Sequence, residues 1–84
     1  MKESKKWMVQ YSHDDGRSGT VEAITEIEKM KEPYYGNGKY GALKIDGYVN
    51  GYDLRYNREK DLHLVMLEAY FGKGLVKATE IKEA

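Results

Sequence analysis

Apolar and polar residues alternate near the start of the chain with the period of a β-strand. Over residues 6–12 the apolar positions are Trp7, Val9 and Tyr11, and a second alternating run covers residues 19–24. A two-residue turn between the runs would place Val9 opposite Glu22. A three-residue loop with Gly16 in a left-handed conformation keeps the apolar residues on one face, and we predict this register. It makes the pairs Trp7–Ala23 and Val9–Val21 and leaves outside Met8, Gln10, Thr20 and Glu22.

The next segment carries the pattern of a helix N-terminus. Thr25-Glu26-Ile27-Glu28 matches a capping box, in which Thr25 is the N-cap and Glu28 binds back to the backbone. Pro33 excludes the helical conformation at the residue before it. We therefore predict a short helix over residues 26–32. A longer helix from Thr20 is the alternative, with apolar residues three apart at Val21, Ile24, Ile27 and Met30.

The dipeptide Asn50-Gly51 is typical of a type I′ hairpin turn, and alternating runs flank it. Counting outward from this turn predicts a hairpin of residues 41–49 and 52–56. One face then carries the pairs Val49–Tyr52, Gly47–Leu54 and Ile45–Tyr56. The other face pairs Tyr48 with Asp53, and Asp46 with Arg55, an opposite-charge pair that favours the same register.

Asn57 is the expected N-cap of a helix that runs to Phe71, where Gly72 and Gly74 stop it. Residues 75–81 then read as a last strand. The predicted class is α+β, an antiparallel sheet of about five strands with one main and one short helix, in the order β-β-α-β-β-α-β. This order fits a ferredoxin-like fold with an extra N-terminal strand, and an irregular antiparallel sheet with one main helix is the alternative.

The main helix has two apolar stripes. One contains Leu62, Val65, Met66 and Ala69, and the other contains Leu64, Leu67 and Phe71. A helix that packs on one sheet needs only one stripe, so a helix that is apolar nearly all round is buried on two sides. The second stripe packs either against the short helix or the last strand, or against a second copy or another protein.

Length and charge exclude several classes of protein. Eighty-four residues form one domain, 1–84, and fourteen basic residues balance fourteen acidic ones. Generic nucleic-acid binders cluster Lys and Arg, whereas here the basic residues have acidic neighbours. The chain has no cysteine and no long apolar run, which excludes a disulfide framework and a membrane span. We expect a cytoplasmic protein without a metal or cofactor.

Two segments resemble motifs with chemistry but lack the context that the chemistry needs. Gly36-Asn-Gly-Lys-Tyr-Gly41 matches G-x-G-x-x-G, yet it precedes a predicted strand, whereas a dinucleotide site needs a helix there. We interpret it as a flexible glycine loop. His13, Asp14 and Asp15 lie together in the first turn, where Asp and Gly residues are required by the turn itself. We therefore expect no catalytic residues and no enzymatic activity.

Tyrosine is the main anomaly of composition, because six of the eight tyrosines lie between residues 34 and 56. In the predicted register Tyr52 and Tyr56 point into the core, while Tyr40 and Tyr48 lie on the opposite face. Tyrosines on a glycine-rich surface are typical of protein-binding sites. The predicted contact residues are Tyr34, Tyr35, Tyr40, Lys44, Tyr48, Leu64, Leu67 and Phe71.

We therefore expect a small protein-binding module. Its short length, balanced charge and lack of a metal site suggest an accessory protein of a phage or mobile element that inhibits a host protein. A homodimer is a further expectation. The alternative is a small nucleic-acid-binding domain that uses loop tyrosines with Lys39, Lys44, Arg55 and Arg58.

Overall fold

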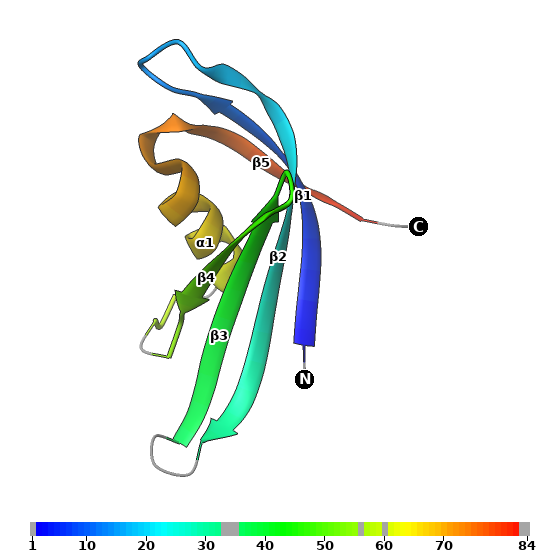
Figure 1. The fold of residues 1–84 in the computed structure, drawn as a ribbon, viewed down its shortest axis with the longest axis vertical. Coiled ribbons are helices and arrows are strands. Elements are labelled where there is room, and N and C mark those ends of the chain that lie inside the picture. The colour runs from blue at the N-terminus through cyan, green and yellow to red at the C-terminus, as the bar shows by residue number, and fades with distance from the viewer. Residues whose placement is uncertain (1, 33–35, 56, 60, 83–84) are drawn as a thin grey trace.

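One antiparallel sheet of five strands, in the order β4-β3-β2-β1-β5, carries a single helix on one face (Figure 1). The computed structural model describes residues 2–32, 36–55, 57–59 and 61–82. The elements of this part of the chain are β1 (Lys2–Ser12), β2 (Ser18–Glu32), β3 (Gly36–Ile45), β4 (Tyr48–Asp53), α1 (Leu62–Phe71), a 3-10 turn (Gly72–Gly74) and β5 (Leu75–Ile81). The α+β class is therefore confirmed.

The first hairpin has the predicted register. Trp7 pairs with Ala23 and Val9 pairs with Val21, and Gly16 has a left-handed φ of 93°. The His13 amide donates to the Arg17 carbonyl at 2.7 Å and closes the loop. Both strands extend beyond the predicted ranges: the alternation of β2 continues through Thr25 and Ile27, and residues 2–5 of β1 pair with this extension.

The predicted short helix over residues 26–32 is wrong, and so is the longer helix from Thr20. These residues belong to β2, which pairs with β1 on one side and with β3 on the other. The reason is the alternation itself: Ala23, Thr25 and Ile27 are all buried on the face that α1 covers. A capping box satisfies a few amide groups, whereas two neighbouring strands pair the backbone along the whole segment. A ferredoxin-like fold needs a helix at this place and is not supported.

The second hairpin turns at Asp46-Gly47 and not at Asn50-Gly51. Both residues have positive φ, 49° and 82°, as a type I′ turn requires, and Ile45 pairs with Tyr48. The two possible turns are offset by an even number of residues. Residues up to Ile45, and those from Tyr52 onward, therefore face the same side of the sheet with either turn. Hydrophobic alternation therefore cannot separate the two registers.

Two further predictions are corrected by this hairpin and the segment after it. Asp46 lies in the turn, so its predicted pairing with Arg55 does not form, and Arg55 instead binds Asp53. Asn57 does not cap the helix, because its side chain accepts from the Glu59 amide in a local turn. The chain must first cross from the sheet edge to the covered face. The helix then begins at Leu62, with Asp61 accepting from the Leu64 amide as N-cap.

The end of the chain follows the sequence pattern closely. Gly72, with a left-handed φ of 56°, ends α1, and β5 covers the predicted residues 75–81. The first strand, β1, pairs with the last, β5, so that the two ends of the chain lie on neighbouring strands (Figure 1). In the described part of the chain, no helix has the length and apolar character that crossing a bilayer demands.

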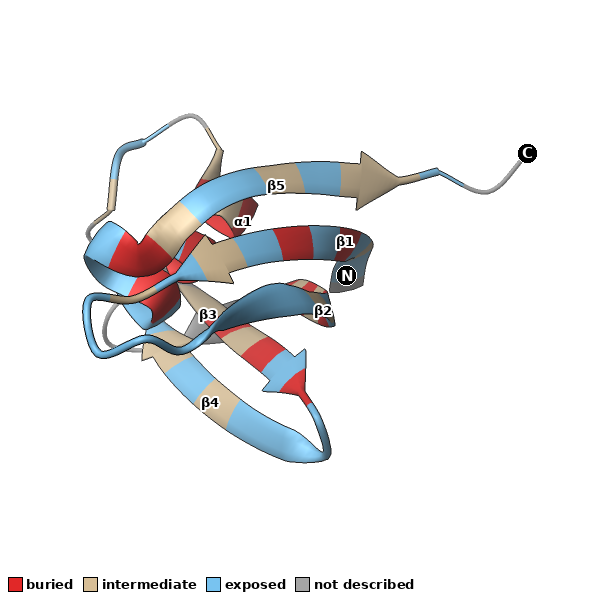
Figure 2. Ribbon diagram, turned by 90° about the horizontal axis from the view of Figure 1, so that it is seen from above, coloured by how far each residue is buried: buried red, intermediate tan, exposed pale blue. Residues whose placement is uncertain are grey.

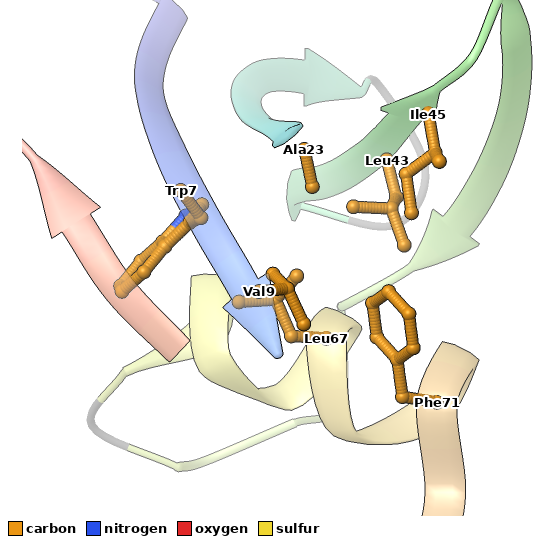
Figure 3. Close-up of a cluster of buried hydrophobic side chains, with 7 residues drawn as sticks. All are labelled: Trp7, Val9, Ala23, Leu43, Ile45, Leu67 and Phe71. Atoms are coloured by element: carbon orange, nitrogen blue, oxygen red, sulfur yellow. The ribbon is translucent and has the colours of Figure 1, made fainter. Parts of the chain in front are cut away.

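One face of α1 is buried against the sheet, and each predicted stripe contributes to it, whereas Val65 is half-buried and Ala69 is exposed. The prediction that the helix is buried on two sides is therefore wrong. Leu67 and Phe71 pack among Trp7, Val9, Ala23, Leu43 and Ile45 (Figure 3). Leu62 and Met66, from the other stripe, form a second cluster with Ile27 and Leu54. The Leu64–Leu67–Phe71 stripe is therefore corrected from a partner surface to core, with Leu64 half-buried at its margin. The sheet is strongly curved and carries the helix on its inner face (Figure 1).

Gly41 on β3 leaves room for the side chain of Met66 on α1. A Cβ atom added to Gly41 would collide with Met66 Sδ and would lie 2.8 Å from Leu54 Cδ1. Gly51, on the neighbouring strand β4, has no atom within 4 Å of such a Cβ. We therefore expect Gly41→Ala to lower the free energy of unfolding by about 1–3 kcal/mol, because overpacking forces side chains or backbone to shift.

Urea denaturation of the two variants measures the difference. Gly51→Ala is the matched control and should leave the midpoint close to that of the unsubstituted protein. Equal destabilisation by both substitutions would show that strand propensity, and not the contact with Met66, sets the requirement for glycine at residue 41.

Candidate binding surface

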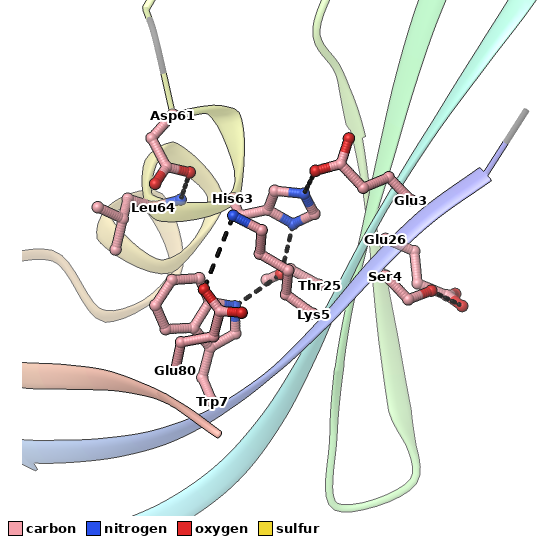
Figure 4. A network of polar contacts seen from close by, with 10 residues as sticks. All are labelled: Glu3, Ser4, Lys5, Trp7, Thr25, Glu26, Asp61, His63, Leu64 and Glu80. Carbon is pink, nitrogen blue, oxygen red and sulfur yellow. Dashed lines mark hydrogen bonds and ion pairs between the residues drawn. The ribbon is translucent and has the colours of Figure 1, made fainter. Parts of the chain in front are cut away.

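A chain of hydrogen bonds joins the sheet to the helix through buried polar groups (Figure 4). The Trp7 indole N–H donates to Thr25 Oγ1 at 2.8 Å, and Thr25 Oγ1 lies 2.7 Å from His63 Nδ1. On its other side, His63 Nε2 lies 3.2 Å from the carboxylate of Glu3. Thr25 and His63 are both buried, while the Glu3 side chain is exposed. The network thus runs from the core to the surface of β1.

One arrangement of protons satisfies every group in this network. Thr25 accepts from Trp7 and donates its hydroxyl proton to His63 Nδ1, and His63 then donates from Nε2 to Glu3. Among the described residues no buried side-chain nitrogen or oxygen lacks a partner. A buried hydroxyl and imidazole that are fully used in this way hold the helix on the sheet, so we interpret His63 as structural.

The first turn holds the other histidine and two carboxylates. Asp15 accepts from the Arg17 amide at 3.1 Å and from Arg17 Nε at 2.7 Å. Because the amide and the guanidinium both stabilise the carboxylate, they lower the pKa of Asp15 below its ordinary value. Asp15 is thus held by the turn and is not positioned against His13 as a catalytic pair. His13 instead packs on Gly74, where any Cβ atom would collide with its ring.

An open pocket of about 400 Å³ lies between this turn and the end of α1. Its lining includes the aromatic rings of Tyr11, Tyr70 and Phe71 and the polar side chains of His13, Arg17 and Asp46. Tyr11 stacks on Phe71 with ring centroids 5.8 Å apart. In the described part of the chain, no three His, Asp or Glu side chains lie close enough to share a metal ion.

The glycine motif of residues 36–41 forms the first half of β3 and is not a loop. It pairs with β2 from Gly36 onward, because β2 continues to Glu32 in place of the predicted helix. The predicted contact residues Tyr34 and Tyr35 lie outside the described residues, as does Tyr56. Tyr52 is half-buried and packs against both core clusters, as predicted, and burial raises its pKa.

The remaining predicted contact residues lie on opposite faces of the sheet. Tyr40 and Lys44 lie on the face away from α1. Tyr40 is half-buried beneath the Arg55 guanidinium, and Lys44 binds Glu26 at 2.8 Å. Tyr48 pairs with Ile45 and lies on the other face, because the turn precedes it. The predicted surface of Tyr40, Lys44 and Tyr48 on one face is therefore corrected.

The residues predicted for nucleic-acid binding have acidic neighbours. Arg55 binds Asp53 at 2.7 Å, and Lys44 binds Glu26. Lys39 lines the same hollow as Glu3 and Glu59, and Arg58 lies in a hollow with Glu59, Asp61 and Glu68. These four cations do not form a continuous basic surface, which is the electrostatic feature that phosphate binding requires.

The two edges of the sheet differ in how they are protected. Edge strands commonly carry charged residues or bulges that prevent pairing with another chain. β5 has both, because Lys77 and Glu80 lie within it and its register with β1 shifts between Gln10 and Tyr11. β4 has neither over Tyr48–Tyr52, which is uncharged and pairs regularly with β3. The β4 edge, defined here as residues 48–53, is thus unprotected over Tyr48–Tyr52. Figure 2 shows β4 at one edge of the sheet and β5 at the other.

The β4 edge also carries the most exposed large apolar side chains of the described residues. Tyr48 is 75% exposed and Val49 is 62% exposed. They lie on opposite faces of the strand, so both faces next to the edge are apolar. Tyr48 was predicted as a contact residue, whereas Val49 was assigned to the core because the turn was misplaced. The Asp46-Gly47 dipeptide is a sequence signal for the observed turn, but Asn50-Gly51 carries the same signal.

No protein-family model, curated protein or solved structure gives a significant match to this chain. Its function is therefore inferred from its own geometry.

The contribution of the hydrogen-bond network to the free energy of unfolding can be tested by substitution of Thr25. Thr25→Val keeps the shape but removes the acceptor of Trp7 and the donor to His63. We expect a loss of about 1–3 kcal/mol in unfolding free energy, because buried polar groups are left without partners. Thr20→Val, at an exposed position of the same strand, should change it little. Thr25→Ser should retain most of the stability, and its failure to do so would contradict the role of the hydroxyl.

The first turn generates a test by titration. We expect Arg17→Ala to raise the pKa of Asp15 only part of the way to its ordinary value of 3.8, because the amide of residue 17 still donates. The ionised carboxylate stabilises the turn above this value, and the stabilisation is lost as the pH falls through the lowered pKa. Carboxyl ¹³C NMR measures the pKa of Asp15 in the unsubstituted protein and in the variant. Asp53, whose pKa is lowered by Arg55, is the internal control and should not move.

Proposed function

We propose that this chain is a protein-binding module and that the β4 edge is its binding surface. The observation that carries the proposal is an edge strand that is uncharged over Tyr48–Tyr52 and whose side chains Tyr48 and Val49 are largely exposed. Contiguous exposed apolar residues next to unpaired backbone are characteristic of surfaces that other proteins cover. Tyrosine favours such contacts, because it supplies a large area at a small cost in conformational entropy.

The rest of the described surface supports this choice over nucleic-acid binding. The formal net charge is zero, and the four predicted cationic residues have acidic partners or neighbours. Non-enzymatic action is part of the proposal, since His13 and His63 are both held in packing or hydrogen bonds that join structural elements. The proposal covers two classes of protein partner for this edge, a host protein that a phage or mobile-element accessory protein would inhibit and a second copy of this chain.

Photo-crosslinking in cell extract tests the surface. A tagged chain with p-benzoylphenylalanine in place of Tyr48 should give a discrete crosslinked protein after illumination. The same group in place of Val76, which is 57% exposed on β5, is the matched control and should give none. Mass spectrometry identifies the product, and nuclease treatment with a high-salt wash removes any contribution from nucleic acid.

A charge introduced on the edge should abolish the crosslink. Val49→Lys places an ammonium group where natural edge strands carry one, and we expect at least a tenfold loss of product, equivalent to about 1.4 kcal/mol. Val76→Lys should leave the product unchanged, and thermal unfolding should show that both variants are folded. Equal crosslinking from residues 48 and 76, or loss of product with both lysine variants, would contradict the proposal.

A further inference from the structure

We propose that the β4 edge pairs with the β4 edge of a second copy of this chain, in antiparallel orientation, to form a symmetric dimer with one continuous sheet. This inference rests on the proposed function, because it names the occupant of the same surface. It replaces the helix stripe as the predicted dimer contact, since Leu67 and Phe71 are buried in the core.

The backbone of β4 is set to receive a strand. The turn at Asp46-Gly47 makes Ile45–Tyr48 the first hydrogen-bonded pair with β3, and such pairs alternate along an antiparallel ladder. The N–H and C=O groups of Val49, Gly51 and Asp53 therefore point away from β3. An added strand satisfies these groups, as in other complexes that extend a sheet at its edge.

The side chains of β4 are complementary to themselves about Asn50. The segment reads Tyr48-Val49-Asn50-Gly51-Tyr52, with a tyrosine at each end. A two-fold axis beside Asn50 places Val49 opposite Gly51 of the second copy, and both residues present outward-facing backbone groups. On the other face Tyr48 lies opposite Tyr52, and Asn50 lies opposite its own copy. Gly51 has no side chain, and the space around it is open, so Val49 of the second copy has room.

Charge also favours a second copy. Residues 48–52 contain no charged side chain, so self-pairing brings no like charges together directly across the new strand pair. The nearest acidic group, Asp53, is neutralised by Arg55 at 2.7 Å. The chain has a formal net charge of zero, so two copies approach without long-range repulsion.

The symmetry axis predicts a specific crosslink. Asn50 and its copy form a pair without backbone hydrogen bonds, in which Cα atoms are about 4.5 Å apart. This separation lies within the range of about 4.4–6.8 Å that disulfides span. The chain contains no cysteine, so a single introduced cysteine reports only on its own position. Asn50→Cys should therefore form a disulfide-linked dimer under mild oxidation, while Thr79→Cys, exposed on β5, should remain mostly monomeric.

Sedimentation equilibrium of the purified chain, from micromolar to near-millimolar concentration, provides the test. We expect twice the chain mass at high concentration, a dimer that Val49→Lys weakens at least tenfold, and no effect of Val76→Lys. Under mild oxidation, the Asn50→Cys variant should form the disulfide-linked dimer at concentrations where the Thr79→Cys variant does not. Val49→Pro removes one outward N–H and should weaken the dimer as well.

Each other outcome separates this inference from the proposed function. A monomer at all concentrations, with a residue-48 crosslink to a different protein, overturns the dimer and retains the β4 edge as a binding surface. A monomer without any residue-48 crosslink overturns both. A dimer that survives Val49→Lys, or that links Thr79→Cys as readily as Asn50→Cys, uses another surface and overturns the inference.

Discussion

The fold depends on the hydroxyl of Thr25, where the sheet and the helix meet. This one oxygen accepts from Trp7 on β1 and contacts His63 on α1, and Thr25 itself lies in the central strand β2. Leaving any of these groups unpaired in the core would be costly, so the helix has one favoured position along the sheet. The two apolar clusters on either side fill the space that this position defines.

The sequence pattern was informative where only one register kept the apolar residues together. The first hairpin was predicted residue by residue, because a shift of one residue at Gly16 would have placed Val9 opposite a glutamate. The second hairpin was not, because the Asp46-Gly47 and Asn50-Gly51 turns differ by an even number of residues. Both also carry the dipeptide that a type I′ turn prefers. Local information could not choose between them, and the long pairing of β3 with β2 decides.

Thr25 is a second place where the local sequence fits two structures equally well. Threonine followed by glutamate three residues later is a good helix start, and a β-branched residue in an alternating run is a good strand position. The sequence near Thr25 satisfies both. Its strand conformation is stabilised by pairing with β1 and β3 and by side-chain hydrogen bonds to Trp7 and His63, which lie eighteen and thirty-eight residues away. The error carried over to the candidate site, since the misplaced turn put Val49 in the core and hid the β4 edge, while Tyr48 was identified from composition.

The pairing of β1 with β5 has a consequence for how the protein is made. Strands β1 to β4 follow one another through turns and can form in sequence as the chain leaves the ribosome, since neighbouring hairpins close quickly. β5 comes after the helix, so the backbone groups of β1 that pair with β5 stay unpaired until β5 has been synthesised. During that interval β1 and β4 are the two edges of the nascent sheet, because β5, the protected edge of the finished sheet, does not yet cover β1. Chaperone demand and misassembly should therefore concentrate in the time needed to synthesise residues 54–81, and slow translation there would lengthen the exposure.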